Sequence, residues 1–371
     1  MKILLINWRC IKNPEAGGAE LHMHEIFKRI ADMGHSVTLV AHLYKGAPKE
    51  EIIDGIKVIR VGNRYLFDRQ FKSYYKKNLA GIDFDLVVDY MTKIPLNTPA
   101  YVKKPLVGAL MHIHGKSMFT ELPFPLSLYV YLKEKRIPVN YKNTPIYVIS
   151  PSTKTDLVNI GYDKNKVEFL YSGIDQDLFN INIPKSLNPS LLYIGRLKKY
   201  KNLEAIIDAM PMVIDAIPNV TLQIAGCGDH EEALKKYVED KKLNDKIIFH
   251  GRVSEEKKVE LMGSAWLFVI MSLMEGWGIV VIEANAAGTP VIGSDVPGLR
   301  DSIVNNKTGI LSPLNDNKKL AENIINLINN PDRLQKTSIE AKKWSDNFTW
   351  DAAAEHFIKT VREKFPELKE R

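Results

Sequence analysis

The sequence predicts an α/β protein built from two doubly wound, Rossmann-like parallel-sheet domains that face each other across a cleft. Three observations support this prediction. The chain has 371 residues, a length that fits two domains of roughly 150 residues or more. Short apolar runs alternate with segments of helical periodicity, and the alternation restarts after a segment rich in Asn, Pro and Ser. Strands separated by helices pair in parallel, so the two series of strands predict two sheets.

The first series begins with a strand over residues 2–7 and a helix over residues 17–33, in which apolar residues recur at helical spacing. Gly34 ends this helix, as a left-handed cap does. Further strands are expected at residues 36–41, 56–61, 85–89, 105–111 and 146–150. These strands, with the helices between them, form the predicted N-terminal sheet.

The predicted linker is residues 180–190 (NINIPKSLNPS), whose composition is typical of irregular chain. After it, strands are expected at residues 191–194, 221–225, 247–250, 266–270 and 291–293, with helices at 203–214, 231–239, 279–287 and from 317 onward. We therefore expect an N-terminal domain over residues 1–182 and a C-terminal domain over 183–347, followed by 348–371. Ligands of such sheets bind at the carboxyl ends of the strands.

Composition excludes several classes of protein. The first apolar run ends at residue 6, which is too short for a signal peptide, and no stretch approaches the roughly 18 apolar residues of a membrane span. The two cysteines, Cys10 and Cys227, have no metal-ligand spacing and are expected to be small packed side chains rather than a disulfide. These features predict a cytoplasmic protein.

The net charge of +7 lies in the first half of the chain. Residues 1–182 hold 25 Lys and Arg against 18 Asp and Glu, and the remaining residues hold 26 of each. Such an excess favours an acidic partner, either an anionic membrane surface or a phosphate-bearing acceptor, or else forms a solvated basic surface. We expect no nucleic-acid partner.

A basic helix with aromatic residues is expected over Arg64–Leu79. Placed on a helix, the aromatic side chains gather on one side and three cations on another; the aromatic residues are Phe67, Phe71, Tyr74 and Tyr75. Two interpretations stay open. The helix lies on an anionic membrane surface, with the protein peripheral to the inner face of the cell membrane, or it lines an acceptor site and never touches lipid.

The strongest candidate site is the segment EGWGIVVIE, which runs from Glu275 to Glu283. Gly276 and Gly278 allow a ligand to approach the main chain closely. A helix begins near Ile279, and its free N–H groups favour an anion such as a phosphate. Ionised carboxylates accept hydrogen bonds, which suits the hydroxyl groups of a sugar or a ribose. The alternative is a glycine-rich turn with two surface glutamates.

Two further motifs follow strands of the second series. Arg196 comes just after a strand and Lys201 just before a helix, so both reach the same edge of the sheet. Two cations there would neutralise a diphosphate, although a basic surface loop is the alternative. Gly226 and Gly228 also follow a strand, where they either hold a phosphate or turn the chain.

Two motifs of the first half complete the set. Gly17 and Gly18 open the first helix and offer another helix start to an anion, or form a tight turn. His112 and His114 lie two residues apart at a strand end, which places them on opposite faces of a strand. A shared metal is therefore not expected. One histidine faces the cleft and binds a sugar, and the other packs.

In their order and spacing these motifs resemble the retaining family 4 glycosyltransferases of the GT-B fold, over nearly the whole chain. Residues 283–292 (EANAAGTPVI) and 308–311 (TGIL) add to the resemblance. It implies transfer of a sugar from a nucleotide-sugar, most naturally a UDP- or GDP-sugar, to a glycan or lipid-linked acceptor in glycan biosynthesis. It also implies that the last helix, within residues 348–371, crosses back onto the N-terminal domain.

The resemblance implies a role for each matching side chain. Arg196 and Lys201 hold the donor diphosphate, Glu275 and His114 contact the donor sugar, and Glu283 binds the nucleotide ribose. Main-chain groups of the glycine-rich segments complete the donor site at Gly17, Gly18, Gly226, Gly276, Trp277, Gly278 and Ile279. The anomeric configuration is kept, and the leaving phosphate is the base that receives the acceptor proton.

The resemblance implies no cofactor and no metal, because the two cations supply the positive charge. Two Asp-x-Asp patterns typical of metal-dependent transferases, at residues 83–85 and 175–177, are interpreted as a strand cap and a loop. The chain departs from the family at residues 172–175 (SGID) and at Arg300 and Asp301, where the family often has other residues. The latter change bears on which sugar is transferred.

Three rival functions remain open from the sequence. A nucleotide-sugar epimerase would share the scaffold but would need acid and base residues at the sugar. A dinucleotide-dependent oxidoreductase is disfavoured because no Gly-x-Gly-x-x-Gly follows the first strand. A non-catalytic module would bind a sugar or a membrane without turnover.

Overall fold

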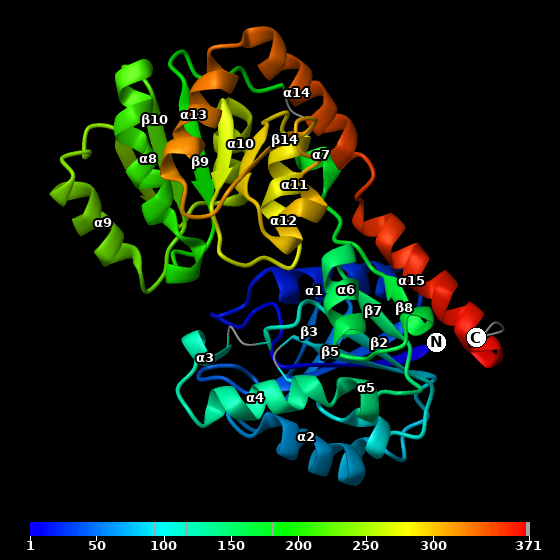
Figure 1. Cartoon of the computed structure of the whole chain (residues 1–371). Helices are drawn as coiled ribbons and strands as arrows, with labels where there is room; N and C mark the ends of the chain where they lie inside the picture. The colour runs from blue at the N-terminus through cyan, green and yellow to red at the C-terminus, as the bar shows by residue number, and fades with distance from the viewer. Residues whose placement is uncertain (93, 116–117, 180–181, 369–371) are drawn as a thin grey trace. The chain divides into compact units, whose positions relative to one another are not determined.

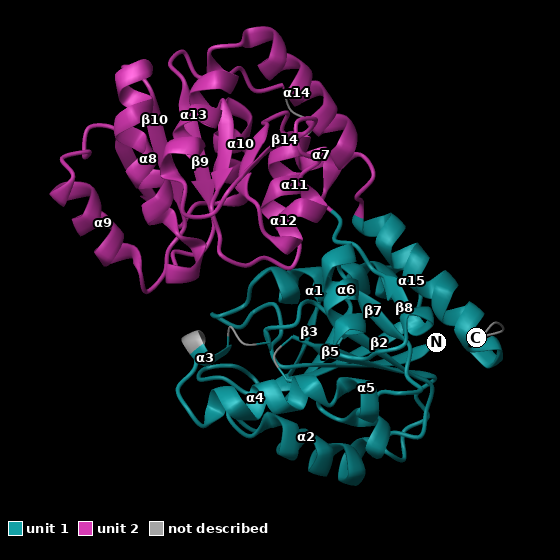
Figure 2. Cartoon of the chain, in the orientation of Figure 1, with its two compact units in different colours: residues 1–173, 350–371 teal, residues 174–349 magenta. Residues whose placement is uncertain are grey.

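The computed structural model describes residues 1–92, 94–115, 118–179 and 182–368. The chain divides into two compact units: unit 1 comprises residues 1–173 and 350–371, and unit 2 comprises residues 174–349 (Figures 1 and 2). Asn180 and Ile181, the first residues of the predicted linker, and residues 369–371 lie outside the described residues.

Unit 1 contains an eight-stranded sheet of order β3-β4-β2-β1-β5-β6-β7-β8. Its strands are β1 (Lys2–Asn7), β2 (Ser36–His42), β3 (Glu50–Ile53), β4 (Ile56–Val61), β5 (Leu86–Met91), β6 (Leu106–Leu110), β7 (Ile146–Val148) and β8 (Val167–Phe169). Strands β3 and β4 pair antiparallel through a turn with positive φ at Asp54 and Gly55, and the other neighbours pair in parallel. The short strands β3 and β8 were not predicted.

Helices cover this sheet. They are α1 (Gly18–Asp32), α2 (Phe67–Tyr74) continued by a π-helix (Tyr75–Leu79), α3 (Met118–Glu121), α4 (Leu126–Lys135), α5 (Ile137–Asn140), α6 (Pro151–Asn159) and α15 (Trp350–Lys364). The last of these, α15, packs on α1, with the rings of Phe27 and Phe357 5.2 Å apart. The hydroxyl groups of Tyr147 and Thr360 also lie 2.7 Å apart. The C-terminal helix is therefore part of unit 1.

Unit 2 contains a six-stranded parallel sheet of order β11-β10-β9-β12-β13-β14. The strands are β9 (Ser190–Ile194), β10 (Thr221–Ala225), β11 (Ile247–Gly251), β12 (Leu267–Ile270), β13 (Val291–Ser294) and β14 (Gly309–Ser312). The helices are α7 (Gln176–Phe179), α8 (Leu203–Ala216), α9 (Glu231–Asp240), α10 (Glu255–Ser264), α11 (Ile279–Ala286), α12 (Pro297–Ser302), α13 (Asn317–Ile328) and α14 (Pro331–Ser345). Two separate parallel-sheet units confirm the predicted fold class.

Of the two interpretations of Arg64–Leu79, contact of its aromatic side with lipid is wrong, and an acceptor contact stays a prediction. Phe67, Phe71 and Tyr75 are buried in the core of unit 1, and Phe67 packs edge-on against Trp8 at 5.3 Å between ring centroids. Periodicity gathered these rings correctly on one side, but it could not tell that this side faces the sheet. Among the described residues no helix has the length and apolarity needed to cross a bilayer.

Candidate functional site

The start of helix α11 lies just past the carboxyl end of β12, where residues 271–278 connect the two elements. Gly278 caps the helix with φ 85° and ψ 69°, a left-handed conformation that favours glycine. A Cβ atom on Gly298 would overlap the main chain of Glu275 and Gly276. Glycine therefore lets the first turn of α12 approach the segment that carries Glu275.

Glu275 and Lys201 form an ion pair, and both side chains are only 13% exposed. The same Glu275 oxygen accepts a hydrogen bond of 2.8 Å from the hydroxyl of Ser272, which is buried. Lys201 belongs to a 3-10 turn over Lys199–Lys201, directly before α8. The structure thus joins the second predicted cation and the first predicted glutamate, although they lie far apart in the sequence.

Arg196 joins this group through a residue that the sequence did not single out. Its guanidinium donates a hydrogen bond of 3.2 Å to the hydroxyl of Tyr200. The ammonium of Lys201 lies 5.1 Å from the centre of the Tyr200 ring. The main-chain oxygen of Arg196 also accepts a 3.1 Å hydrogen bond from Tyr193. Both predicted phosphate-binding cations therefore contact one phenol ring; its position beside Lys201 was the available signal.

The Gly226–Gly228 loop packs against the loop that carries Arg196. A Cβ atom on Gly226 would overlap the carbonyl of Gly195, and one on Gly228 would overlap the carbonyl of Leu197. The Leu197 N–H donates to the carbonyl of Cys227 at 3.0 Å. Close packing of the two loops accounts for both glycines. A contact between Gly226 and a donor stays a prediction.

Glu283 is buried in the middle of α11, and its carboxylate accepts a 2.9 Å hydrogen bond from Lys258 on α10. Lys258 also pairs with Glu255 at 2.6 Å. Burial lowers the pKa of Lys258, but the two carboxylates outweigh it and the net pKa shift is upward. Since Glu275 and Glu283 are both largely enclosed, the alternative of two surface glutamates is wrong.

The first helix of unit 1 begins at the predicted glycine pair. Gly17 is the residue before α1, and its N–H donates to the Glu20 carboxylate at 2.8 Å. One amide of this helix start is thus already bonded within the chain. Gly18 is exposed, and a donor or acceptor contact at either glycine stays a prediction.

The predicted placement of His112 and His114 on opposite faces of a strand is wrong. Strand β6 ends at Leu110, so both histidines lie in irregular chain. Their ring nitrogens are 3.1 Å apart and their ring centroids 4.0 Å apart. Alternation applies only within a strand, and the strand end was placed too late.

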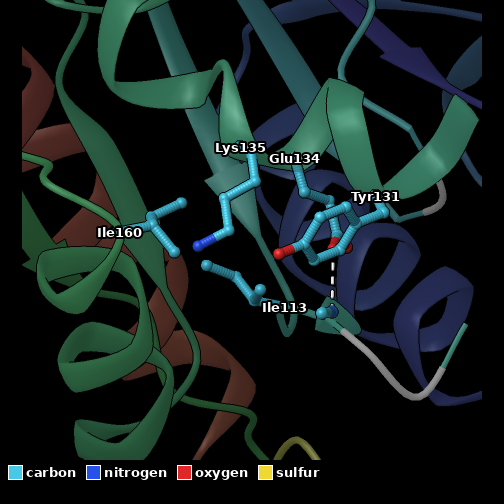
Figure 3. Close-up of a pocket in the computed structure, with 6 residues that line it drawn as sticks. Ile113, Tyr131, Glu134, Lys135 and Ile160 are labelled. Carbon is cyan, nitrogen blue, oxygen red and sulfur yellow. Dashed lines mark hydrogen bonds between the residues drawn. The ribbon is translucent and has the colours of Figure 1, made fainter. Parts of the chain in front are cut away.

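Glu134 on α4 binds the main chain of the segment that contains the two histidines. Its two carboxylate oxygens accept hydrogen bonds from the N–H groups of His114 at 3.0 Å and Gly115 at 2.8 Å. Burial raises the pKa of Glu134 to about 7, although these two bonds act in the opposite direction. A small cavity of about 160 Å³ opens beside it (Figure 3), lined by Ile113, Gly115, Tyr131, Glu134, Lys135 and Ile160. Sequence reasoning missed Glu134.

Within the described ranges, no group of three or more His, Cys, Asp and Glu side chains is placed to hold a metal ion. In the first Asp-x-Asp pattern, Asp85 accepts a hydrogen bond from the Lys2 N–H at 2.7 Å and Asp83 pairs with Lys104 at 2.6 Å. These contacts agree with a structural interpretation of that pattern.

Two Rossmann-like units, one of which has paired cations and a glycine-rich helix start beyond its strands, fit a glycosyltransferase of the GT-B class. Residues 16–178 match the family described as Glycosyltransferase Family 4, and residues 175–344 match Glycosyl transferases group 1. An uncharacterized glycosyltransferase of Methanocaldococcus jannaschii is 28% identical over 340 residues, or 84% of each chain. The chain therefore belongs to the group 1, family 4 glycosyltransferases.

Solved structures share the fold. Sucrose-phosphate synthase from Thermosynechococcus elongatus superposes with a TM-score of 0.82 at 21% identity, over 99% of both chains. HepE from Anabaena, in complex with UDP-glucose, gives a TM-score of 0.77 at 18% identity, over 98% of this chain and 100% of its own. At these identities the likeness establishes the fold alone.

Proposed function

We propose that this glycosyltransferase takes its sugar from a UDP- or GDP-sugar and transfers it, with retention of configuration, to a glycan or lipid-linked acceptor. The observation that carries the proposal is the convergence of Arg196 and Lys201 on Tyr200, with Lys201 also paired to Glu275. Two cations in one place suit a diphosphate. A fold neighbour, HepE, binds UDP-glucose, which supports the same class of donor here.

In the proposed reaction, the bond between the anomeric carbon and the donor phosphate oxygen breaks while the acceptor oxygen bonds to that carbon. The acceptor proton passes to the departing phosphate oxygen, so charges and atoms balance without an enzymatic nucleophile. Arg196 and Lys201 stabilise the charge that grows on the diphosphate. Glu275 exchanges part of its contact with Lys201 for the sugar hydroxyls, and Glu283 binds the ribose. Sugar contact by His114 stays a prediction.

The same two cations support a reaction that needs no metal and no cofactor. Positive charge from side chains and positive charge from a divalent ion act on the diphosphate in the same way. Transfer should therefore continue in excess chelator. A transfer rate that collapses with chelator and returns with Mg²⁺ or Mn²⁺ contradicts this part of the proposal.

The donor assignment is tested by thermal shift with UDP-, GDP- and ADP-sugars, followed by calorimetric titration of the best ligand. Lys201→Ala should weaken binding by about 100-fold, since a largely enclosed cation is lost, and Arg196→Ala by about tenfold, since that side chain is exposed. The matched control is Lys199→Ala, an exposed cation of the same turn. Unchanged affinity in both site variants refutes the assignment.

Product analysis separates the transferase from the epimerase. The transferase needs an acceptor and yields a product of retained configuration, detected by proton coupling at the anomeric position. An epimerised nucleotide-sugar formed without acceptor contradicts the proposal. So does donor binding without turnover across a panel of glycan and lipid-linked acceptors.

We also infer that the protein works in the cytoplasm, at the inner face of the cell membrane when its acceptor is lipid-linked. Two observations support this inference: Cys10 and Cys227 are free thiols, which suits a reducing compartment, and the net positive charge of the chain comes from the first half of the sequence. Cell fractionation tests it. Because Phe67 and Phe71 of α2 are buried, a membrane contact would not use these rings.

A further inference from the structure

Ser272 lies just past the carboxyl end of β12, three residues before Glu275. It is fully buried, and its hydroxyl donates a 2.8 Å hydrogen bond to Oε1 of Glu275. Most side-chain hydrogen bonds in proteins go to the main chain or to water, whereas this one goes to a carboxylate of the candidate donor site. Ser272 is therefore placed to control the position of Glu275.

The two contacts of the Glu275 carboxylate use the same oxygen atom. Oε1 accepts the hydrogen bond of Ser272 and pairs with the ammonium of Lys201, whereas no hydrogen bond from the described residues reaches the other oxygen, Oε2. An ionised carboxylate has acceptor positions on both of its oxygens. The side chain of Glu275 also keeps 13% of its surface exposed. One oxygen is thus fixed within the chain, and the other is left to accept from the hydroxyl groups of a ligand.

The turn that carries Ser272 is itself bonded to two neighbouring segments. Ser294, which is buried at the end of β13, donates its hydroxyl to the carbonyl of Ser272 at 2.6 Å. The N–H of Leu273 donates to the carbonyl of Tyr200 at 2.8 Å, which ties the turn to the segment that carries Lys201. A functional side chain keeps its direction when the residues that hold it are fixed in this way. Ser272 is therefore a rigid support for Glu275.

The two groups on Oε1 differ in how a bound donor would affect them. Under the proposed function the ammonium of Lys201 also binds the diphosphate, so its attraction is divided between two anions. Ser272 offers a neutral hydroxyl on a buried turn, which a diphosphate attracts far less than it attracts a cation. The bond from Ser272 therefore persists when the ammonium of Lys201 moves toward the diphosphate, and it keeps the Glu275 carboxylate in place at that moment.

We propose that Ser272 is a positioning residue for recognition of the donor sugar. Its hydroxyl fixes Oε1 of Glu275, so that Oε2 accepts hydrogen bonds from the sugar hydroxyls while Lys201 binds the diphosphate. This inference rests on the proposed function and adds to it a residue that acts on the sugar part of the donor and not on the nucleotide part.

The test is calorimetric titration of Ser272→Ala with the nucleotide-sugar that the wild type prefers and with the matching free nucleoside diphosphate. Loss of a hydrogen bond to an ionised carboxylate should weaken binding of the nucleotide-sugar roughly tenfold, whereas affinity for the free diphosphate should stay within about twofold. In a Glu275→Ala background, Ser272→Ala should cause almost no further loss, because a residue that acts through Glu275 has nothing left to position.

The matched control is Ser190→Ala, which removes another buried serine hydroxyl of unit 2, at the first residue of β9 and thus at the opposite edge of the parallel sheet. It should bind both ligands like the wild type. Equal weakening of both ligands by Ser272→Ala, unchanged affinity for the nucleotide-sugar, or additive losses in the double variant overturns this inference and leaves the donor assignment intact. A wild type that binds no nucleotide-sugar contradicts the donor assignment and this inference together.

Discussion

Tyr200 links the two cations of the proposed donor site, and its removal is expected to weaken binding of a nucleoside diphosphate in two separable steps. Tyr200→Phe deletes the hydroxyl that accepts the 3.2 Å hydrogen bond from Arg196 but keeps the ring beneath Lys201. Hydrogen bonds to charged groups contribute about 1.5–3 kcal/mol. The bond is long and Arg196 is exposed, so we expect about 1 kcal/mol, or roughly a fivefold loss of affinity.

Tyr200→Leu deletes the ring as well. A cation over an aromatic ring contributes about 0.5–1 kcal/mol when exposed and about 2 kcal/mol when desolvated. The ammonium of Lys201 lies 5.1 Å from the ring centre and its side chain is only 13% exposed, which favours the upper value. Added to the hydroxyl, the loss becomes about 2–3 kcal/mol, or roughly 30- to 150-fold.

Isothermal titration of UDP and GDP into wild type and both variants measures the two steps. The matched control is Tyr237→Phe, which removes a hydroxyl bonded at 2.7 Å to Asp208 elsewhere in unit 2. Its affinity should equal that of the wild type. If Tyr200→Leu binds the preferred nucleotide as tightly as the wild type, Tyr200 does not organise the cations, and the convergence seen in the structure has no bearing on the donor.

Three further predictions concern residues that hold the candidate sites. Because burial raises the folded pKa of Glu134 from 4.5 to about 7, the folded state binds the extra proton between these values; thermal melts from pH 4.5 to 8 should show a stability loss of about 2–3 kcal/mol with rising pH that Glu134→Gln lacks. Gly298→Ala should cost about 1–3 kcal/mol in urea unfolding because its Cβ overlaps the main chain of Glu275, whereas Gly81→Ala, in open space, should not. Lys258→Met should lower the free energy of unfolding by about 2–4 kcal/mol, because the buried carboxylate of Glu283 loses its cation, and Lys258→Arg should keep most of that stability. A Met variant as stable as the wild type in urea unfolding contradicts the ion-pair assignment.

Much of the fold could be predicted from the sequence because its signals are local. The parallel strands β1, β2 and β5 are short apolar runs between helices, and their residues decide both the strand and its burial. Strand β3 escaped prediction because its residues Glu50–Ile53 carry two acidic side chains and lie at the sheet edge. The Asp54–Gly55 pair that turns the chain into β4 was the missed signal, since Asp-Gly favours a hairpin turn.

In the candidate site, too, the local signals could be predicted from the sequence and the long-range contacts could not. Arg196, Lys201 and Glu275 could be proposed because each lies in a short loop just after a strand, where a parallel sheet collects its ligand-binding groups. The contacts that hold them could not, because they form between segments that are distant in sequence. Lys258 reaches Glu283 across 25 residues and Glu134 reaches Gly115 across 19. No periodicity or spacing encodes such pairs.

Helices α2 and α4 show why a binding surface is harder to predict than a helix. The aromatic residues of α2 gather on one side because that side packs in the core of unit 1, where Phe67 and Phe71 are buried. The pattern of α4 gives no such signal because its buried residues are Ser127, Val130 and Glu134, and only the structure shows that Leu126 and Leu132 are left exposed. Amphipathicity measures the contrast between two faces of a helix, and in a globular domain the apolar face ordinarily packs against the core. The apolar residues left exposed after the core is filled, such as Leu132 and Val139, can therefore be identified only from the structure and not from the most amphipathic segment of the chain.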